Sequence, residues 1–503
     1  MLRKLRIALS VSFTVLLTVY LIDFTGTLPQ VFKELARWQV IPALLSLNLL
    51  VIIVLTLLTF ITGRLYCSTL CPLGFFQDVV SRVASFVQKK KRFRYQKSLN
   101  WLRWLVVVAC VVAFTTGFTF LVGFFDPYSI FMRMSVHMLK PVYLAGNNLM
   151  ELIFSNFGNH TFYKMSIYLL SGFSLGVALF GFLVIGLMAW RNGRIYCNTI
   201  CPVGTTLGLA GKAAFVKIRI DESKCNSCGA CGRRCKSSCI DTKTHFIDYS
   251  RCVVCFDCID VCSQSAIRFT AKKSKISVQT PVDNSKRTFL FALGATSLAA
   301  GKLIASSSVA PFSTKNKAKR QVPISPPGST GHDNLLSKCT SCHLCVSKCP
   351  TGIIKPAFTE YGAGGVMQPM LNFEHGFCNY DCSICSDVCP TGALLPLNKE
   401  HKHELQIGQV HFVSENCIVV TDGTHCGACS EHCPTQAVSM VPYKNGLDIP
   451  FTRTEICVGC GGCEYVCPAT PHKAIYVEGI AKHQKIVLEK AEKKEIEVND
   501  FGF

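Results

Sequence analysis

Residues 63–74 read GRLYCSTLCPLG, and residues 193–204 read GRIYCNTICPVG. The two segments share the pattern G-R-x-Y-C-x3-C-P-x-G, and each follows a long apolar stretch. A match of this kind over twelve positions indicates an internal duplication. Duplicated segments can place equivalent sites around one pseudo-two-fold axis, as they do in transporters. The N-terminal part of the chain is therefore predicted to form two related helical hairpins, each ending in a pair of cysteines.

Four apolar segments, each about 18–26 residues long, are long enough to cross a ~30 Å hydrocarbon core as helices. They are residues 7–24, 38–61, 101–125 and 165–190. Buried helices of a soluble protein can also be apolar all round, but four segments of this length favour a membrane bundle. The hydrophobic content of 49% and the charged content of 17% agree with that interpretation.

The net charge of +21 could indicate nucleic acid, a membrane surface or an acidic partner. Much of it flanks the apolar segments, so membrane topology explains it best and no nucleic-acid partner is expected. The flanking residues include Arg3, Lys4, Arg6, Arg64, Arg82, Arg94, Lys97, Arg191 and Arg194. By the positive-inside rule, both ends of the bundle and its middle connection should face the cytoplasm. The first segment has no cleavage site behind it and is expected to be an anchor.

A cysteine-rich unit follows the second repeat. Its cysteines form two sets with the spacing C-x2-C-x2-C-x3-C, the pattern of bacterial ferredoxins that hold two [4Fe–4S] clusters. In that pattern three closely spaced thiolates bind one cluster, and the fourth binds the other. The predicted ligands of cluster one are Cys225, Cys228, Cys231 and Cys262, and those of cluster two are Cys252, Cys255, Cys258 and Cys235.

Four more cysteine sets lie nearer the C-terminus, and a proline follows each of them. They are Cys339, Cys342, Cys345 and Cys349; Cys378, Cys382, Cys385 and Cys389; Cys417, Cys426, Cys429 and Cys433; and Cys457, Cys460, Cys463 and Cys467. The second and third sets have a longer first spacing, which lengthens one loop. The sets could pair as neighbours or in a nested order, and the ligands are the same either way. Six [4Fe–4S] clusters are thus predicted for the chain.

Zinc and disulfides are the alternatives for so many cysteines. Structural zinc usually takes paired cysteines separated by a longer loop, and disulfide frameworks are typical of small secreted proteins. Six sets of four cysteines at these spacings favour clusters. Residues 339–343 also read C-x-x-C-H, a haem c motif, but they lie inside a complete cysteine set. The absence of a G-x-G-x-x-G or phosphate-loop motif leaves direct NAD(P)H or ATP chemistry without support.

The four repeat cysteines are Cys67, Cys71, Cys197 and Cys201. If the repeats are symmetric, these thiols converge at one face of the membrane, where they could hold a seventh centre, either a cluster or a single metal ion. They could equally be packing thiols or redox-active thiols without metal, and both interpretations stay open. Cys110 is expected to fill apolar space, and Cys239 to be a spare thiol.

Composition divides the chain into five parts. Residues 1–211 are predicted to form a four-helix membrane domain, and residues 212–275 a two-cluster ferredoxin domain. Residues 276–331 contain a basic linker, an apolar stretch at 289–312 that would be a fifth span, and a Ser/Pro-rich linker. Residues 332–481 form the four-cluster domain, and residues 482–503 a charged tail. The predicted fold class is a membrane α-helical bundle with α+β ferredoxin-like iron–sulfur domains.

The two repeats and the first pair of cysteine sets resemble NapH, the polyferredoxin membrane subunit of periplasmic nitrate reductase systems, and the related NosR and CcoG families. The second unit resembles NapG, a four-cluster partner exported by the twin-arginine route. The whole chain is therefore similar to a NapH–NapG fusion. Residues 285–290, SKRTFL, resemble a twin-arginine signal with lysine in place of the first arginine. The resemblance implies a bacterial inner membrane protein with its first unit in the cytoplasm and its second in the periplasm.

The family resemblance implies a quinol dehydrogenase that takes electrons from menaquinol or ubiquinol and passes them to a terminal reductase or cytochrome. Its partners would be the lipid bilayer, the quinone pool and redox proteins. Two alternatives remain: a transmembrane conduit fed by cytosolic ferredoxin, and an assembly or regulatory factor for another metalloenzyme. No catalytic residue is predicted. The connection between residues 126 and 160 could line a quinone site or lie in the membrane interface as a helix.

Overall fold

The computed structural model describes residues 1–24, 26, 28–88, 93–158, 160–167, 171–271 and 320–486. The apolar stretch at 289–312, the twin-arginine-like segment at 285–290 and residues 487–503 of the predicted tail lie outside the described residues. The N-terminal domain is helical. Its elements are α1 (Leu2–Ile22), η1 (Gln30–Phe32), α2 (Lys33–Arg37), α3 (Val40–Leu45), α4 (Leu49–Thr62), α5 (Tyr66–Thr69), α6 (Pro72–Val87), α7 (Asn100–Thr115), α8 (Thr119–Phe125), α9 (Pro127–Met134), η2 (Ser135–Leu139), α10 (Lys140–Ser155), α11 (Gly172–Asn192), α12 (Ile195–Thr199) and α13 (Pro202–Lys212).

Two helices of the described residues, α1 and α11, are long and apolar enough to cross a bilayer, judged by length and composition alone. They correspond to the first and fourth predicted spans. The other two predicted spans are each divided: α3 and α4 make up one, and α7 and α8 the other. Four continuous spans are therefore not confirmed.

Both divisions have a local backbone cause. Leu47, between α3 and α4, has a φ of 54°, and Gly117, between α7 and α8, has a φ of 80°. A left-handed residue cannot continue an α-helix, so the chain turns at each point. Asn48 then restarts α4 by accepting a hydrogen bond from the backbone N–H of Val51 at 3.3 Å. Hydrophobicity along the sequence does not reveal either break.

The duplication is visible in how the hairpins pack. α4 and α11 end at glycines of positive φ, Gly63 and Gly193, and each glycine is followed by a short helix and then by a helix with proline in its first turn. The helix that follows the first repeat, α6, packs against α11 of the second half, and α13 packs against α4 of the first. Each half is therefore completed by the other.

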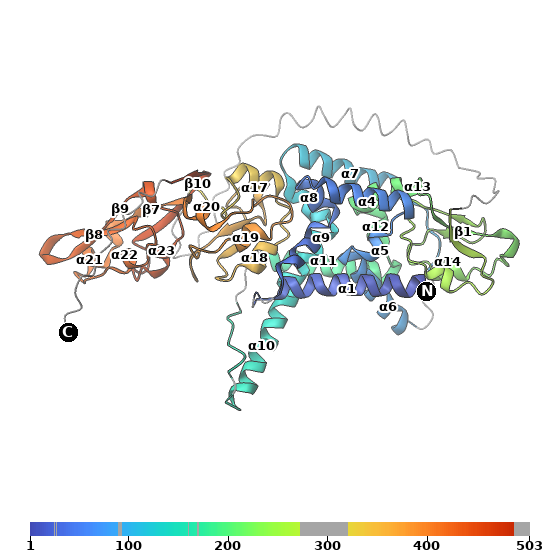
Figure 1. Cartoon of the computed structure of the whole chain (residues 1–503), viewed down its shortest axis with the longest axis horizontal. Coiled ribbons are helices and arrows are strands. Elements are labelled where there is room, and N and C mark those ends of the chain that lie inside the picture. Colours follow the sequence, from blue (N-terminus) through green and yellow to red (C-terminus); the bar gives the residue numbers. More distant parts are fainter. Residues whose placement is uncertain are drawn as a thin grey trace, which may run out of the picture.

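The first cysteine-rich unit contains α14 (Ala230–Arg234) and α15 (Asp257–Asp260), which pack together, and two small antiparallel sheets. In these sheets β1 (Lys217–Ile220) pairs with β4 (Ile267–Thr270), and β2 (Ile240–Asp241) with β3 (Phe246–Ile247). This unit lies beside the start of α1, at the end of the helical domain where the chain begins (Figure 1).

The second cysteine-rich unit lies at the opposite end of the helical domain (Figure 1). Its helices are α17 (His332–Lys338), α18 (Leu344–Lys348), α19 (Ile384–Asp387), α20 (Lys399–His403), α21 (Ile418–Thr421), α22 (Ala428–Glu431) and α23 (Gly462–Val466). Its antiparallel strand pairs are β5 (Ile354–Pro356) with β6 (Pro369–Leu371), β7 (Leu405–Phe412) with β10 (Ile475–Lys485), and β8 (Val438–Pro442) with β9 (Asp448–Thr452). β10 extends past residue 481, so the first residues of the predicted tail belong to this domain.

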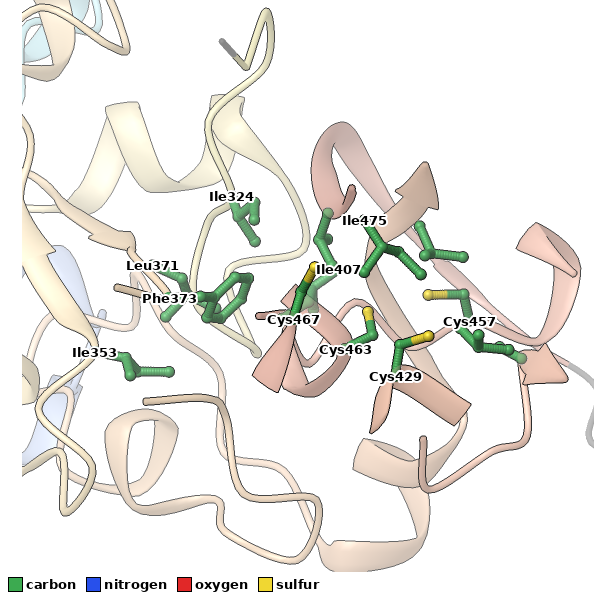
Figure 2. Packing of buried hydrophobic residues seen from close by; sticks show 14 of the residues in the cluster. Ile324, Ile353, Leu371, Phe373, Ile407, Cys429, Cys457, Cys463, Cys467 and Ile475 are labelled. Carbon is green, nitrogen blue, oxygen red and sulfur yellow. The ribbon is translucent and has the colours of Figure 1, made fainter. Parts of the chain in front are cut away.

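One hydrophobic core runs through the second unit and includes many of its cysteines. Figure 2 shows Cys429, Cys457, Cys463 and Cys467 near Ile407 and Ile475 in this core. Strand residues such as Ile407, Val438 and Ile475 pack with the cysteines in this core.

Candidate iron–sulfur centres

The first unit brings its eight predicted ligands together as two groups of four. Site A (Cys225, Cys228, Cys231 and Cys262) lines one cavity, and site B (Cys252, Cys255, Cys258 and Cys235) lines another. Each site takes three cysteines from one set and the fourth from the other set. This is the exchange that the spacing predicts for a two-cluster ferredoxin.

The second unit pairs its cysteine sets as neighbours, which resolves the alternative that the sequence left open. Site E (Cys417, Cys426, Cys429 and Cys467) and site F (Cys457, Cys460, Cys463 and Cys433) each line one cavity. The cysteines of the other two sites are grouped by the influence of their charges on one another. Site C contains Cys339, Cys342, Cys345 and Cys389, and site D contains Cys378, Cys382, Cys385 and Cys349. Burial, and then the charges of Cys342, Cys339 and Cys389, raise the pKa of Cys345. Burial, and then Cys378 and Cys349, raise the pKa of Cys385.

The chemistry of these groups fits metal clusters. All thirty cysteines are free thiols, which leaves the disulfide alternative without support. Burial raises the pKa of Cys258, Cys345 and Cys463, so these thiols are poor anions on their own. A bound cationic core would stabilise their thiolate forms. Among the described residues no group of three or more His, Cys, Asp or Glu is arranged to hold a single metal ion. Ligands of a four-iron cubane are spread around a larger core.

The loops between the cysteines share an unusual conformation. In each set with the regular spacing, the residues just before and just after the second cysteine have positive φ. They are Ser227 and Gly229, Val254 and Phe256, Ser341 and His343, and Gly459 and Gly461. Non-glycine residues, and β-branched valine above all, rarely adopt this region, and such strain is concentrated at functional sites. The repeated geometry curls the backbone around a common centre in all four sets.

The four repeat cysteines also converge. Cys67, Cys71, Cys197 and Cys201 are all buried in one hydrophobic cluster of the helical domain, which is called the four-thiol site below. Cys71 and Cys201 occupy the N-cap positions of α6 and α13. The Cys201 Sγ accepts a hydrogen bond from Gly204 N at 3.3 Å. The helix N-terminus favours negative charge at this position, whereas burial raises the pKa of the Cys201 thiol.

Two arginines tie the repeats together at this site. Arg64 donates from Nη2 to the backbone oxygen of Cys197 at 2.9 Å, and Arg194 donates from Nη1 to the backbone oxygen of Cys67 at 2.5 Å. Both side chains have no exposed surface. They were counted in the sequence among the charges that orient the bundle, and the structure buries them inside the helical domain, while the membrane topology stays a prediction. The signal in the sequence was the identical position of arginine in both repeats.

The repeat glycines make room for these arginines. A β-carbon at Gly204 would lie 2.2 Å from the backbone oxygen of Cys197 and 2.7 Å from Nη2 of Arg64. At Gly74 it would lie 2.5 Å from the backbone oxygen of Cys67 and 3.3 Å from Nη1 of Arg194. The final glycine of the C-P-x-G pattern is therefore required for steric reasons in both repeats.

The polar groups around the four thiols fit an anionic centre. Gln77 donates from Nε2 to the Sγ of Cys197 at 3.2 Å. Arg64 Nε and Arg194 Nη2 are buried donors without a hydrogen-bond partner. Buried donors are normally satisfied, and a thiolate-bound cluster would supply acceptors here. The residues therefore fit a metal centre better than four neutral packing thiols.

The first unit contacts the helical domain around the four-thiol site. Asp78 on α6 pairs with Arg194 at 2.6 Å, with Arg6 at 2.9 Å and with Lys236 of the first unit at 2.7 Å. Arg64 donates to the backbone oxygen of Ser250 at 2.9 Å. Val253 and Cys255 share the hydrophobic cluster that contains the four thiols. Site B is therefore the neighbour of the four-thiol site.

The second unit contacts the helical domain through the loop that carries site C. Thr119 donates to the backbone oxygen of Cys339 at 3.2 Å, and Arg133 donates to that of Ser341 at 3.1 Å. Leu344 and Val388 join a cluster with Leu17, Leu21 and other residues of the helical domain. Site C is thus buried against the helical domain.

His343, which follows Cys342, also belongs to this contact. Its Nε2 lies 2.9 Å from the backbone oxygen of Met367, and its Nδ1 lies 2.9 Å from Nε2 of His137 on η2. The carbonyl can only accept, so His343 Nε2 is the protonated nitrogen of the neutral ring. Burial lowers the pKa of His343. The histidine of the C-x-x-C-H pattern is thus a docking residue, a role that the pattern alone does not suggest.

Helix α9 lies between the two contact regions. All of its residues are buried. Just before it, the backbone oxygen of Phe125 accepts a hydrogen bond from Tyr196 of the second repeat at 2.8 Å. Arg133, near its other end, reaches Ser341 beside site C. α9 therefore links the four-thiol region to the second unit.

The contacts arrange the sites in an order along the molecule. Site A pairs with site B, which lies beside the four-thiol site. Across the helical domain, site C pairs with site D. The backbone N–H of Cys378 in site D donates to the oxygen of Cys460 in site F at 2.9 Å. The order beyond the helical domain is therefore C, D, F and E.

The family models agree with a chain built from iron–sulfur modules. A model described as a 4Fe-4S binding domain matches residues 44–94 and 174–220, which contain the two repeats. Models described as 4Fe-4S dicluster domains match residues 338–394 and 424–470. These matches and the cysteine geometry define an iron–sulfur electron-transfer protein of the ferredoxin type.

Individual relatives are Nap-type ferredoxins and electron-transport proteins. Ferredoxin-type protein NapH of Escherichia coli strain K12 is 29% identical over 46% of this chain and 71% of its own length. Ferredoxin-type protein NapF of the same organism is 27% identical over 31% of this chain and 85% of its own. Putative electron transport protein YccM of the same Escherichia coli strain is 22% identical over 49% of this chain and 60% of its own length. The chain is thus related to the polyferredoxins, at low identity and over part of its length. No solved structure matches the chain.

The NapG-like resemblance of the second unit stays a prediction. The two long apolar helices, α1 and α11, are compatible with membrane association by their length and composition.

Proposed function

We propose that this chain is a membrane-bound quinol dehydrogenase that passes electrons from menaquinol or ubiquinol to a terminal reductase. One observation carries the proposal: site C is buried against the helical domain, and sites D, F and E lead away from it. Electrons from a donor in the membrane would thus enter next to the bundle and leave at the distal end, where site E lies.

The residues of the chain hold and tune the centres. Bound [4Fe–4S] clusters would supply one-electron chemistry at the six sites. The cysteines position the sites, while burial and hydrogen bonds to sulfur adjust their potentials. The Ser341 N–H, for example, donates to the Sγ of Cys339 at 3.4 Å, and the Leu394 N–H donates to that of Cys389 at 3.4 Å.

We place the protein in a bacterial inner membrane, with the first unit in the cytoplasm and the second in the periplasm. The position of the two units at opposite ends of the helical domain supports this topology (Figure 1). In it, α1 and α11 cross the membrane as single helices, and the divided pairs α3–α4 and α7–α8 cross beside them.

We also propose that the four-thiol site holds a seventh metal centre. Support comes from the convergence of the four thiols, the unpartnered arginine donors and the 4Fe-4S family match over both repeats. A variant with Cys67, Cys71, Cys197 and Cys201 all changed to Ser should lose iron and sulfide relative to the parent protein. Unchanged iron and sulfide contents would refute the proposal.

A second candidate function is a transmembrane conduit from cytosolic ferredoxin to periplasmic acceptors. The arrangement of site B, the four-thiol site and α9 favours it, because these features lie between site A and site C. The same arrangement would be superfluous if all electrons entered beside site C.

Reconstituted liposomes separate the two functions. We expect menaquinol in the bilayer to reduce the clusters of purified, cluster-loaded protein, followed by electron paramagnetic resonance. Reduced ferredoxin outside the vesicles serves as the alternative donor. Reduction by ferredoxin but not by menaquinol would reject the quinol dehydrogenase and leave the conduit. Reduction by menaquinol alone would do the reverse.

A further inference from the structure

A large cavity lies where the second unit meets the helical domain, beside site D. Its volume is about 510 Å³. The helical domain contributes the end of α1, the start of α10 and residues 164–167 to its walls. The second unit contributes residues 346–352 and the helix α19. The cavity therefore exists only where the two parts are docked.

One wall of this cavity carries a predicted cluster ligand. Cys349 of site D lines the cavity together with its neighbours Lys348 and Pro350. α18, which carries Cys345 of site C, ends directly before Cys349. A molecule in the cavity would thus contact the loop that links the two sites nearest to the helical domain.

The lining combines fixed polar groups with apolar surface. Lys348 Nζ donates to the backbone oxygen of Asp23 at 3.0 Å, pairs with its carboxylate at 3.3 Å and lies 4.2 Å from the ring centroid of Tyr20. Asp387 of α19 supplies a second carboxylate, and Leu144 of α10 an apolar surface. Small-molecule sites are mostly apolar with a few such polar groups.

Helix α10 offers an apolar approach to the cavity. It projects away from the rest of the molecule (Figure 1). Val142, Leu149 and Leu152 are exposed on it, with 70%, 53% and 58% of their surface accessible. An exposed apolar helix of this kind is typical of a surface that faces lipid. A ligand with a polar ring and a long hydrocarbon tail could lie with its ring in the cavity and its tail along α10.

We propose that this cavity is the site where a membrane quinol binds and is oxidised. The inference rests on the proposed function and adds the location. Oxidation of the quinol to the quinone breaks two O–H bonds and releases two electrons and two protons. The electrons would pass one at a time to the clusters that the cysteines of sites C and D would hold. Asp23 and Asp387 are placed to accept the protons and pass them to water.

Four lysines also line the cavity, Lys33, Lys140, Lys164 and Lys348. Such a set could instead hold the anionic headgroup of a phospholipid. The position of Cys349 of site D in the cavity wall favours the quinol, because a phospholipid headgroup makes no use of a cluster ligand.

The test uses the full-length, cluster-loaded protein with a photoreactive azido-quinone and with menaquinol in liposomes. Leu144→Trp fills the cavity from the α10 side, and Ile384→Trp fills it from the side of the second unit. Leu183→Trp is the matched control, because Leu183 is exposed on α11 and does not line the cavity. We expect the label on peptides that contain Leu144 or Cys349, and its loss in both cavity variants. The rate of cluster reduction by menaquinol should fall about tenfold in these variants, as expected for a tenfold weaker binding of the quinol.

Reduction by dithionite should be unchanged in all three variants, which shows that the clusters and the fold are intact. If menaquinol does not reduce the clusters of the parent protein and the azido-quinone does not label it, the quinol dehydrogenase function itself is rejected. If menaquinol reduces the parent and both cavity variants equally, and the label lies elsewhere, only the location is wrong. If no label is found but an anionic phospholipid co-purifies with the parent and is lost in Leu144→Trp, the cavity is a lipid site and the proposal is overturned.

Discussion

At the scale of single residues, Arg64 and Arg194 contribute most to the four-thiol site. Each binds the backbone of the other repeat, and Arg194 also pairs with Asp78. Breaking a buried ion pair by removing one partner costs about 3–5 kcal/mol, because a buried charge is left behind. The reciprocal geometry implies that loss of either arginine should disturb both pairs of thiols.

We therefore expect Arg194→Gln to reduce the iron content by about four atoms per chain, the content of one cubane. Arg191→Gln is the matched control, because Arg191 is exposed and lies three residues earlier on the same segment. Iron and sulfide analysis of both variants gives the measurement. Full iron occupancy in Arg194→Gln, at the level of the control, would contradict the assigned role.

Cys239 is a second residue whose role the sequence conceals. It was expected to be a spare thiol, yet it is buried, lines the cavity of site B and lies 3.5 Å from the Sγ of Cys235. Hydrogen bonds to cluster sulfurs raise the reduction potential, because they stabilise the more negative reduced state. A net hydrogen bond of about 0.5–1.5 kcal/mol corresponds to about 20–60 mV for a one-electron couple.

Cys239→Ala should accordingly lower the potential of the site B centre by about 20–60 mV. Redox titration followed by electron paramagnetic resonance measures the shift. Cys110→Ala serves as the control, since Cys110 packs with Val106 and Ala113 away from the cluster sites. A potential equal to that of the parent protein would show that the Cys239 thiol does not reach the cluster sulfurs.

The ligand groups were largely readable from the sequence because cluster geometry restricts cysteine spacing. The structure groups the cysteines of the first unit as the spacing predicts. The left-handed conformations at Val254 and Phe256 could not be predicted, because neither residue favours positive φ. The same holds for the buried arginines, since a charged residue after an apolar segment usually marks the membrane surface.

At the scale of elements, the two broken helix pairs take part in the contact with the second unit, beside α1, α9 and η2. A β-carbon at Gly392 would lie 3.8 Å from the Cα of Ser46, at the α3–α4 break. One at Gly364 would lie 3.5 Å from the ring of Phe118, at the α7–α8 break. The breaks therefore shape the end of the bundle to receive the ferredoxin loops. Two of the four predicted spans are continuous helices, and the other two are interrupted at Leu47 and Gly117.

Gly123 on α8 offers a direct test of docking. A β-carbon there would lie 2.0 Å from the backbone oxygen of Thr340, so Gly123→Ala should push the second unit away. Overpacking typically costs about 1–3 kcal/mol, and a clash with backbone is at the upper end. Limited proteolysis between residues 320 and 338 should become faster in this variant.

Gly146→Ala is the control for this experiment, because Gly146 lies in α10 with open space where the β-carbon would be. The control should digest at the rate of the parent. Equal digestion of Gly123→Ala and Gly146→Ala would mean that the second unit does not rest on α8.

At the scale of the whole molecule, the chain is an elongated series of sites with the helical domain near its middle (Figure 1). Protease added to spheroplasts should cut the second unit and spare the first, because the proposed topology places them on opposite sides. Immunodetection of each unit provides the measurement, and lysed cells provide the control for accessibility. Protection of the second unit in intact spheroplasts would contradict this topology.

The order of the sites was not predictable from the sequence. The cysteine pattern allowed neighbour or nested pairing, and the packing of α18 with α19 and of α22 with α23 agrees with neighbour pairing. The contacts of sites B and C with the helical domain depend on residues such as Asp78 and Arg133, which carry no recognisable motif.

The exchange of the fourth cysteine has a consequence for damage and repair. Cys262 comes from the set that serves site B but completes site A, and Cys349 likewise completes site D. Oxidative loss of one cluster therefore frees a segment that also anchors its neighbour. Each pair should decay and be rebuilt as one unit, so a population of partly damaged molecules would contain even numbers of clusters in the two ferredoxin units.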